Sequence, residues 1–415
     1  MYQFLQWVAT LPVLALIAWK LLWIARHFRQ TDVVVVMPEG GFGHTIHGPD
    51  VARRLYVGQR TVFVVLSEYQ RHNCASSLIW PDISVFFLPL SIGFRASGRA
   101  WAFGQTPWLK NVIPPIIFAL ARWMSGSRIR RSTLMQLYTD IPVNEAYRRE
   151  IAVIPAHRRH HLAVFRLMDE TPAPPPVHLP DKIRQPVVER LARLRNSSDI
   201  QERLCALYLR QRGPGDASTF GRDGSTPDEY RAAIQLLVAS GYQVLLTGDR
   251  ILSVELYEEF RGMLLDYRFA KVDRKLFNIF AATEPHIFIG EHGGGSLLPG
   301  INRIPRLLVN MFPYYVALPH SWMYYKTVTD ETGKMIHFKT LFSKYPYDFE
   351  LPGMTLHSNT SNELAAAVKA FISDIAHPGP DPYANVLAGL SDNVWIKHLN
   401  DARLSPAFVR LFEGS

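Results

Sequence analysis

The stretch DVVVVMPEGGFGHTIHGPD, residues 32–50, decides the fold of the first half of the chain. Residues 33–37 form a short, continuous apolar run, as expected for a parallel strand that is buried on both faces. A glycine-rich turn follows, a helix is expected from near Pro49, and a second apolar run comes at residues 61–66. Strand, glycine-rich loop, helix and strand in this order predict the start of a doubly wound α/β domain.

The second half of the chain repeats this pattern. The apolar runs of strand length are LCALYL (204–209), YQVLLTG (242–248), HIFI (286–289) and RLLVN (306–310). Helices are expected between and after them, including residues 228–241, 277–285, a helix from Ser296 and residues 362–374. The alternation of strands and helices predicts a second parallel sheet.

A proline-rich stretch separates the two halves. Residues 169–186 hold six prolines, and proline at this density favours an extended, semi-rigid linker. We therefore predict an α/β fold with two doubly wound, Rossmann-like domains. The expected parts are an N-terminal helix (1–28), a first α/β domain (29–168), the linker, a second α/β domain (187–375) and a tail that packs back on the first domain (376–415).

Basic charge is concentrated in the first half. Of 45 Lys and Arg and 36 Asp and Glu in the 415 residues, residues 1–165 hold 18 and 8, which leaves 27 and 28 for the rest. This asymmetry predicts an anionic partner, either nucleic acid or acidic lipid. A hydrophobic content of 48% excludes wholesale disorder, and two cysteines, Cys74 and Cys205, fit neither a disulfide framework nor a zinc site.

The N-terminus favours lipid. Residues 2–24 are apolar and long enough to cross a hydrocarbon core of about 30 Å. Arg26 and Arg29 follow this segment and no charged side chain precedes it, so the positive-inside rule predicts a single-pass anchor with the body of the protein on the cytoplasmic face of the inner (cell) membrane. The alternative is a buried N-terminal helix. The basic excess matches no nucleic-acid-binding motif, so no nucleic-acid partner is expected.

A second apolar stretch, residues 107–131, ends in three arginines. Pro114 and Pro115 interrupt it, which argues against a second membrane span. We favour an interfacial helix or hydrophobic platform, with an ordinary core helix as the alternative. Basic residues at 148–149 and 157–161 strengthen the prediction of a surface attracted to anionic lipid, although they also fit a solvated loop.

Glycines and charged residues stand where the predicted strands end. PEGGFGH (38–44) follows the first strand, Arg210 follows LCALYL, Asp249 follows VLLTG, and GEHGGGS (290–296) follows HIFI. Open parallel sheets bind ligands beyond the carboxyl ends of their strands. These positions predict a cleft enzyme that uses strand-end residues from both domains.

GEHGGGS fits a cradle for phosphate. Glycines let the backbone approach a ligand, the following helix offers unpaired N–H groups, and His292 and Ser296 add side-chain donors. The run lacks the spacing of a Rossmann dinucleotide site and the Gly-Lys-Ser/Thr of a Walker loop. One Glu–His pair supplies too few ligands for a metal site. The alternative is a tight turn between strand and helix.

Charged groups beside these loops suggest the chemistry. Arg210 can bind a diphosphate bidentately and stabilise charge on a departing nucleotide, or it can form a surface salt bridge with Asp216 or Asp223. His44 and His47 follow the first glycine-rich turn, where a histidine can accept a proton from a hydroxyl near neutral pH. A structural role is the alternative for each histidine.

Three motifs resemble a family of bacterial glycosyltransferases with a GT-B-like fold. They are LYLRQRGPGD (207–216), GYQVLLTGDR (241–250) and FIGEHGGGSLLPGINRIPRLLVNMFP (288–313). Members of the family share a strand that ends in arginine, then GYxVxxxGD, then FIGxxxGxxxLPxxxxxPxLxxN. The resemblance covers residues 204–345, about a third of the chain.

The resemblance implies a pocket for a nucleotide-sugar donor in the second domain and an acceptor side in the first. The expected donor-binding residues are Arg210, Asp249, Gly290, Glu291, His292, Gly293, Gly294, Gly295 and Ser296. The loop in the first domain is similar to acceptor-side loops of this fold, through Glu39, Gly40, Gly41 and Gly43. Tyr208 stands where the family usually has histidine, and Glu291-His292-Gly293 replaces a Gly-Ser-Gly turn, so we expect donor choice to depend on Glu291 and His292.

Together these features predict a membrane-anchored glycosyltransferase. It would move a sugar from a nucleotide-sugar donor to a lipid-linked or cell-envelope glycan acceptor, with His44 or His47 as base and Arg210 offsetting the charge on the leaving nucleotide. No metal and no resident cofactor are expected, because arginine and backbone N–H groups can neutralise the diphosphate. The alternatives are a nucleotide-sugar epimerase of the same architecture and a non-catalytic scaffold in a polysaccharide-assembly complex.

Overall fold

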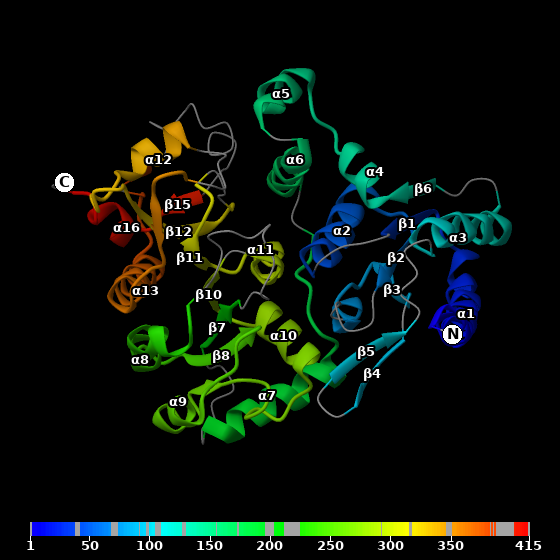
Figure 1. The fold of residues 1–415 in the computed structure, drawn as a ribbon, viewed down its shortest axis with the longest axis horizontal. Coiled ribbons are helices and arrows are strands. Elements are labelled where there is room, and N and C mark those ends of the chain that lie inside the picture. The colour runs from blue at the N-terminus through cyan, green and yellow to red at the C-terminus, as the bar shows by residue number, and fades with distance from the viewer. Residues whose placement is uncertain are drawn as a thin grey trace. The chain divides into compact units, whose positions relative to one another are not determined.

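The computed structural model divides into two compact units, residues 1–142 with 170–177 and residues 143–169 with 178–415 (Figure 1). Each unit is built around a sheet of parallel strands, so the predicted α/β fold with parallel sheets is confirmed. The structure describes residues 2–37, 42–67, 74–90, 92–96, 99–103, 109–126, 130–154, 156–171, 174–195, 203–210, 225–291, 293–314, 318–345, 351–381, 383–384, 386 and 402–413.

The first sheet has the strand order β3-β2-β1-β6, with all pairs parallel. Its strands are β1 (Val33–Met37), β2 (Thr61–Ser67), β3 (Ile83–Pro89) and β6 (Arg130–Thr133). All five residues of β1 are buried, as expected for a continuous apolar run that is covered on both faces. An antiparallel pair, β4 (Ile92–Ala96) and β5 (Arg99–Phe103), follows β3. The two strands predicted in this half are confirmed.

The helix after β1 begins earlier than predicted. α2 spans Phe42–Leu55, so Pro49 lies inside it and not at its start. Proline is favoured in the first turn of a helix because it lacks an N–H and fixes φ near the helical value. That preference predicted a start at Pro49, but the helix begins before the proline and continues through it. As a consequence, Gly43, His44 and His47 lie on a helix and not on a loop.

Two helices, α1 (Tyr2–Phe28) and α3 (Leu109–Ser125), cover one face of the first sheet and contact each other (Figure 1). The predicted N-terminal helix is therefore present. Its segment Leu11–Phe28 is apolar enough to cross a membrane, while 33% of that segment is buried inside the protein. α3 runs through Pro114 and Pro115 without a break. The unit is completed by η1 (Cys74–Leu78) and α4 (Leu134–Thr139).

The second sheet has seven parallel strands in the order β15-β12-β11-β10-β7-β8-β9. They are β7 (Leu204–Leu209), β8 (Gln243–Gly248), β9 (Leu264–Leu265), β10 (Ile287–Glu291), β11 (Arg306–Met311), β12 (Ser321–Tyr325) and β15 (Ala402–Leu404). The four predicted strands are confirmed, and β10 extends beyond its predicted end so that Gly290 and Glu291 belong to the strand. The sequence did not indicate β9, β12 or β15.

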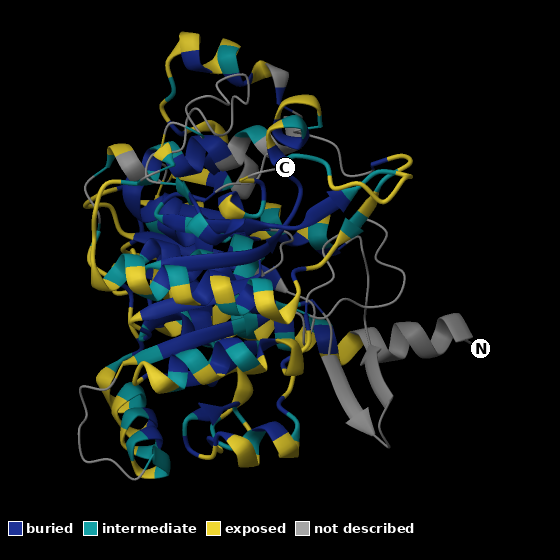
Figure 2. Cartoon of the chain, turned by 90° about the vertical axis from the view of Figure 1, so that its left-hand side faces the viewer, coloured by how far each residue is buried: buried dark blue, intermediate teal, exposed yellow. Residues whose placement is uncertain are grey.

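Helices flank this sheet, and buried residues gather in its strands (Figure 2). The helices of the second unit are α5 (Glu145–Glu150), η2 (Ile151–Val153), α6 (Ala156–Glu170), α7 (Asp181–Arg195), η4 (Asp228–Tyr230), α8 (Arg231–Ala239), α9 (Val254–Glu259), α10 (Arg274–Thr283), η5 (Gly294–Ser296), α11 (Leu297–Ile301), α12 (Phe338–Lys344), α13 (Ser361–Ala376) and α16 (Pro406–Arg410). A small antiparallel pair joins β13 (Thr327–Thr329) to β14 (Thr355–His357). The helices predicted in this half are present as η4 with α8, α10, η5 with α11, and α13.

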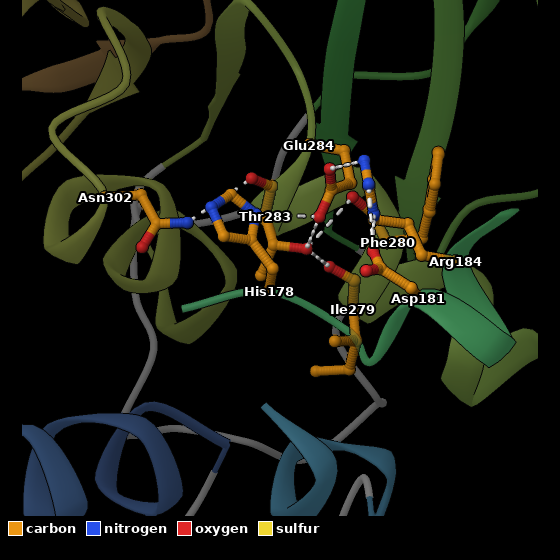
Figure 3. Close-up of polar contacts among 8 residues, drawn as sticks. All are labelled: His178, Asp181, Arg184, Ile279, Phe280, Thr283, Glu284 and Asn302. Atoms are coloured by element: carbon orange, nitrogen blue, oxygen red, sulfur yellow. Dashed lines mark hydrogen bonds and ion pairs between the residues drawn. The ribbon is translucent and has the colours of Figure 1, made fainter. Parts of the chain in front are cut away.

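The stretch predicted as a linker is helical over its last part. α7 begins at Asp181 and includes Pro186, so this proline does not mark a boundary. Figure 3 shows how the start of α7 is attached to the end of α10: Nδ1 of His178 lies 2.9 Å from Oε1 of Glu284, and Arg184 approaches the other carboxylate oxygen at 3.5 Å. These contacts hold the start of α7 in place, which the proline content of the segment does not predict.

The described part of the C-terminal tail belongs to the second unit. β15 pairs with β12, and α16 packs on α13 and β12. The expectation that the tail packs back on the first domain is therefore corrected for residues 402–413, because they complete the edge of the second sheet.

Candidate functional site

The second sheet reverses its strand order between β7 and β10. From β7 the chain proceeds to β8 and β9 on one side, then returns to β10, β11 and β12 on the other. In open parallel sheets, ligands bind outside the carboxyl ends of the strands at such a reversal. Arg210 follows β7 and Glu291 ends β10, so these two predicted site residues are brought to this edge. Asp249 follows β8 on the next strand along and is exposed.

The glycines of the predicted cradle make room for Tyr208. A Cβ on Gly295 would lie 2.3 Å from Cε2 of the Tyr208 ring, and a Cβ on Gly290 would lie 2.6 Å from the Tyr208 carbonyl oxygen. The Gly295 N–H donates to the Tyr208 hydroxyl, and burial raises the pKa of that hydroxyl to about 12. At least two glycines of the run are therefore required by a side chain of the protein itself. The structure therefore supports the tight turn between strand and helix, and it leaves the phosphate cradle as a prediction.

Arg210 lies on the backbone of this loop. A Cβ on Gly293 would be 2.8 Å from Cδ and 2.9 Å from Nη1 of Arg210, so a larger residue here would displace the guanidinium. The guanidinium and the loop amides thus occupy the same side of the strand ends. That juxtaposition is what a diphosphate would require.

Glu291 is turned inward and holds two loop ends together. Its Oε2 accepts the backbone N–H of Arg210 at 3.0 Å, and its Oε1 accepts that of Ser225 at 2.7 Å. The side chain is buried, and burial raises its pKa to about 7 against the opposing effect of these two hydrogen bonds. Both carboxylate oxygens are engaged, so Glu291 positions the backbone of Arg210, and its expected role in donor contact stays a prediction.

A buried asparagine pair extends this network and was not predicted. The backbone N–H of Asn310 donates to Oδ1 of Asn359 at 2.6 Å, and the N–H of Asn359 donates to Oδ1 of Asn310 at 2.7 Å. Nδ2 of Asn310 donates to Oγ of Ser225 at 3.0 Å. Asn310 adopts the left-handed region with φ 51°, which asparagine tolerates better than most residues. The asparagine that ends the FIGxxxGxxxLPxxxxxPxLxxN motif was the available signal.

Arg306 is the second missed residue. It is fully buried at the start of β11, where its Nη1 donates to the carbonyl oxygen of Ser296 at 2.7 Å and its Nη2 to that of Pro319. Burial lowers the pKa of this guanidinium. The hydroxyl of Ser296 donates to the carbonyl oxygen of Gly293 at 2.7 Å. Ser296 therefore closes the loop internally, and its expected role in donor binding stays a prediction.

The histidines predicted as bases lie in the first unit. Nδ1 of His44 is 3.4 Å from the Tyr138 hydroxyl, and burial lowers the pKa of His44, which keeps it neutral near pH 7. His47 is buried on the same helix. Asp50 is buried and pairs with Arg54 at 2.8 Å, so the α2 carboxylate is already occupied. Of the two histidines, His44 retains the larger exposure and the chemistry of a proton acceptor.

Several predicted residues lie outside the described part of the chain. They are Glu39, Gly40, Gly41 and His292. Among the residues that the structure describes, no group of three or more His, Cys, Asp and Glu side chains is arranged to hold a metal ion.

No family model matches the chain, and no curated protein matches it. The solved structures that are similar in fold include the following three. A glycosyl transferase family 9 protein from Veillonella parvula has a TM-score of 0.47 at 10% identity, over 83% of this chain and 97% of its own. The ADP-heptose LPS heptosyltransferase II of E. coli has a TM-score of 0.37 at 12% identity, over 66% and 83%. The iron-containing dodecameric glycosyltransferase TibC of enterotoxigenic E. coli has a TM-score of 0.37 at 12% identity, over 84% and 76%.

Proposed function

We propose that this protein is a glycosyltransferase that takes a sugar from a nucleotide-sugar donor bound at the β7–β10 edge of the second unit. The observation that carries the proposal is the placement of Arg210. It stands at the strand-order reversal, its guanidinium lies against Gly293, and its backbone N–H is fixed by Glu291. A cation held beside glycine-loop amides at this edge suits the diphosphate of a nucleotide sugar.

In the proposed reaction an acceptor hydroxyl attacks the anomeric carbon of the donor sugar. The bond from that carbon to the diphosphate oxygen breaks, and the nucleoside diphosphate leaves with the bonding electrons. Arg210 and the loop amides offset the negative charge that develops on it, and no metal is assigned a role. His44, neutral because burial lowers its pKa, takes the proton of the acceptor hydroxyl.

The proposed acceptor is a lipid-linked or cell-envelope glycan. Its support is the basic first half of the chain and the apolar N-terminal helix, which together suit a site of action at a membrane whose lipids are anionic. We also propose the cytoplasmic face as the location, because the arginines that follow the apolar segment suit the anionic surface of the cytoplasmic leaflet.

The first experiment measures nucleoside diphosphate released from a panel of nucleotide sugars in the presence of envelope lipid extract. Arg210→Ala should lower the rate by about 10²–10³-fold, because it removes a group that stabilises the leaving charge. Arg261→Ala is the matched control, since Arg261 is an exposed arginine paired only with Glu258 among the described residues. Equal rates in both variants would contradict the role of Arg210.

The same assay separates the alternative functions. Donor alone should give no new sugar nucleotide; its appearance would indicate an epimerase. A requirement for added manganese would contradict the metal-free mechanism. No ligand-dependent rise in melting temperature with any nucleotide or nucleotide sugar, together with no release of nucleoside diphosphate, would favour a scaffold.

A further inference from the structure

α1 and α3 each carry two apolar faces. The inner face of α1 is a stripe at helical spacing, Val13, Ile17, Leu21, Ile24 and Phe28, that packs in the core of the first unit. The inner face of α3 repeats every fourth residue, from Leu109 through Ile113 and Ile117 to Ala121, and packs in the same core. These inner stripes cover one face of the first sheet.

The outer faces are also apolar and are exposed. On α1 they include Leu11, Trp19 and Leu22, the last 68% exposed. On α3 they include Val112, Ile116 and Trp123, the last 79% exposed. A helix on the surface of a water-soluble protein usually turns a polar face outward. Because α1 and α3 contact each other, their outer faces form one apolar surface, here called the α1–α3 platform.

The charge around the platform has a single sign. Residues 1–31 contain three Lys and Arg and no Asp or Glu, and residues 83–139 contain seven Lys and Arg and no Asp or Glu. Arg26 and Arg122 are exposed near the ends of α1 and α3. An apolar surface with exposed arginines near its helix ends is complementary to an anionic bilayer, because the acyl chains can contact the apolar side chains and the phosphates can pair with the arginines.

A hollow of about 620 Å³ lies beside the platform, between α1 and the edge strand β3. Trp19, Lys20, Trp23 and His27 line it from α1, and Phe86 lines it from β3. The Trp23 and Phe86 rings meet edge to face with centroids 5.1 Å apart. Tryptophan with a nearby cation is the side-chain composition that suits the boundary between headgroups and acyl chains.

A spanning arrangement of α1 conflicts with this packing. A helix that crosses a bilayer on its own meets lipid around its whole circumference. To do so, α1 would withdraw Ile17 and Leu21 from the core and leave Val34 and Val64 of the sheet uncovered. A helix that lies in the membrane plane keeps its inner face on the sheet and places its outer face in lipid.

We infer that the α1–α3 platform binds the surface of an anionic phospholipid bilayer in the plane of the membrane, without a transmembrane span. The inference goes beyond the proposed function, since it requires neither the donor nor transfer. It replaces the single-pass anchor by a two-helix surface to which α3 contributes as much as α1.

Vesicle flotation of the full-length protein tests the platform. The protein should float with vesicles that contain phosphatidylglycerol and less with phosphatidylcholine alone, and salt should weaken binding. The double variant Ile116→Glu/Trp123→Glu, altered only on the outer face of α3, should lower binding by about tenfold or more, because two charges would enter the acyl region. Leu22→Glu tests α1 separately, with an unchanged melting temperature as evidence of folding.

Val57→Glu is the matched control, because Val57 is an apolar residue of the first unit, 80% exposed, that lies outside both helices. It should bind like the wild type. Wild-type flotation of the α3 double variant would overturn the inference, because a span formed by α1 alone does not need α3. A second result would also overturn it: the wild type does not float, and the double variant is a monomer where the wild type is a dimer. The platform would then be a contact between two copies of the chain.

Topology gives an independent result. Epitope tags are added at both ends of the full chain, and sealed inside-out membrane vesicles are treated with protease. An in-plane platform leaves both tags on the same side, so both should be cleaved. An N-terminal tag protected until detergent is added would show a span and refute the platform. Neither measurement uses a sugar nucleotide, so either outcome leaves the proposed transferase activity to its own test.

Discussion

Gly295→Ala should destabilise the second unit through a single contact with Tyr208. The new Cβ would lie 2.3 Å from Cε2 and 2.6 Å from Cζ of the ring. Gly295 belongs to the short η5 helix, and its φ lies outside the left-handed region, so alanine is compatible with the backbone and the penalty is steric. The Tyr208 ring also lies beside the Phe288 ring, with centroids 6.0 Å apart, which limits its movement.

The expected loss is near the upper end of the range for overpacking, about 3 kcal/mol of unfolding free energy. Tyr208→Ala should itself lower stability by about 3–5 kcal/mol, because it leaves a cavity where the ring was. Added to Tyr208→Ala, however, Gly295→Ala should have almost no further effect, since its Cβ enters that cavity. The coupling energy between the two substitutions should therefore be about 2–3 kcal/mol.

Urea unfolding of the full chain, read by pulsed hydrogen exchange in peptides that cover 204–210, restricts the measurement to the second unit. Gly379→Ala serves as the control, because no heavy atom lies within 4 Å of the position of its Cβ. Additive effects of the two substitutions would refute the steric explanation. If Gly295→Ala instead weakened nucleotide-sugar binding equally in both backgrounds, the glycine would serve the ligand and not Tyr208.

Three further predictions follow from the buried charged groups. Glu291→Gln removes a group whose pKa burial raises from 4.5 to about 7, so the stability that the protonated acid contributes is fully present below about pH 4.5 and is lost as pH rises through about 7. Between about pH 5 and 8.5, the difference in unfolding free energy should therefore shift in favour of the variant by about 3 kcal/mol. A shift in favour of the wild type would show that the two backbone hydrogen bonds outweigh the effect of burial. Arg306→Met should lower stability by about 2–5 kcal/mol in urea unfolding, because it leaves the carbonyl oxygens of Ser296 and Pro319 without their donor, and an unchanged midpoint would contradict this. If His44 is the base, the acidic limb of the kcat/KM profile should lie below about pH 6.5, because burial lowers its pKa, and His44→Gln should abolish that limb; a limb unchanged in the variant would assign it to another group.

The strands could be predicted because their signal is local. β1 and β7 are continuous apolar runs bounded by charged residues or proline, and their observed limits, Val33–Met37 and Leu204–Leu209, match the runs in the sequence. β9 has only two residues and β15 three, too few for any periodic pattern. These strands exist because neighbouring strands offer unpaired backbone groups, a property of the folded sheet that no local window contains.

The predictions of the α2 start and of the linker differ from the structure because both took proline as a boundary of regular structure. Pro49 and Pro186 both lie inside helices, although proline in sequence usually marks a boundary. Around Pro186, the ion pairs of Arg184 and His178 with Glu284 attach α7 to α10 and offset the missing backbone hydrogen bond. The partner Glu284 is about a hundred residues away in sequence, which explains why composition alone predicted an extended linker.

The glycine run shows the same limit at the candidate site. The sequence identifies glycines that admit a close neighbour but does not identify that neighbour. In the structure one neighbour is Tyr208, which pairs with Gly290 in the register of β7 and β10. Glu291 comes next in β10 and binds the N–H of Arg210, which stands two residues after Tyr208. The two departures from the glycosyltransferase pattern, at 208 and at 291, are therefore neighbours across one strand pair. The Tyr208 ring needs the space that Gly295 leaves, and the Glu291 carboxylate holds the backbone N–H of Arg210 beside it. Tyr208 and Glu291 therefore lie side by side and keep Arg210 at the strand ends, where we propose that the donor diphosphate binds.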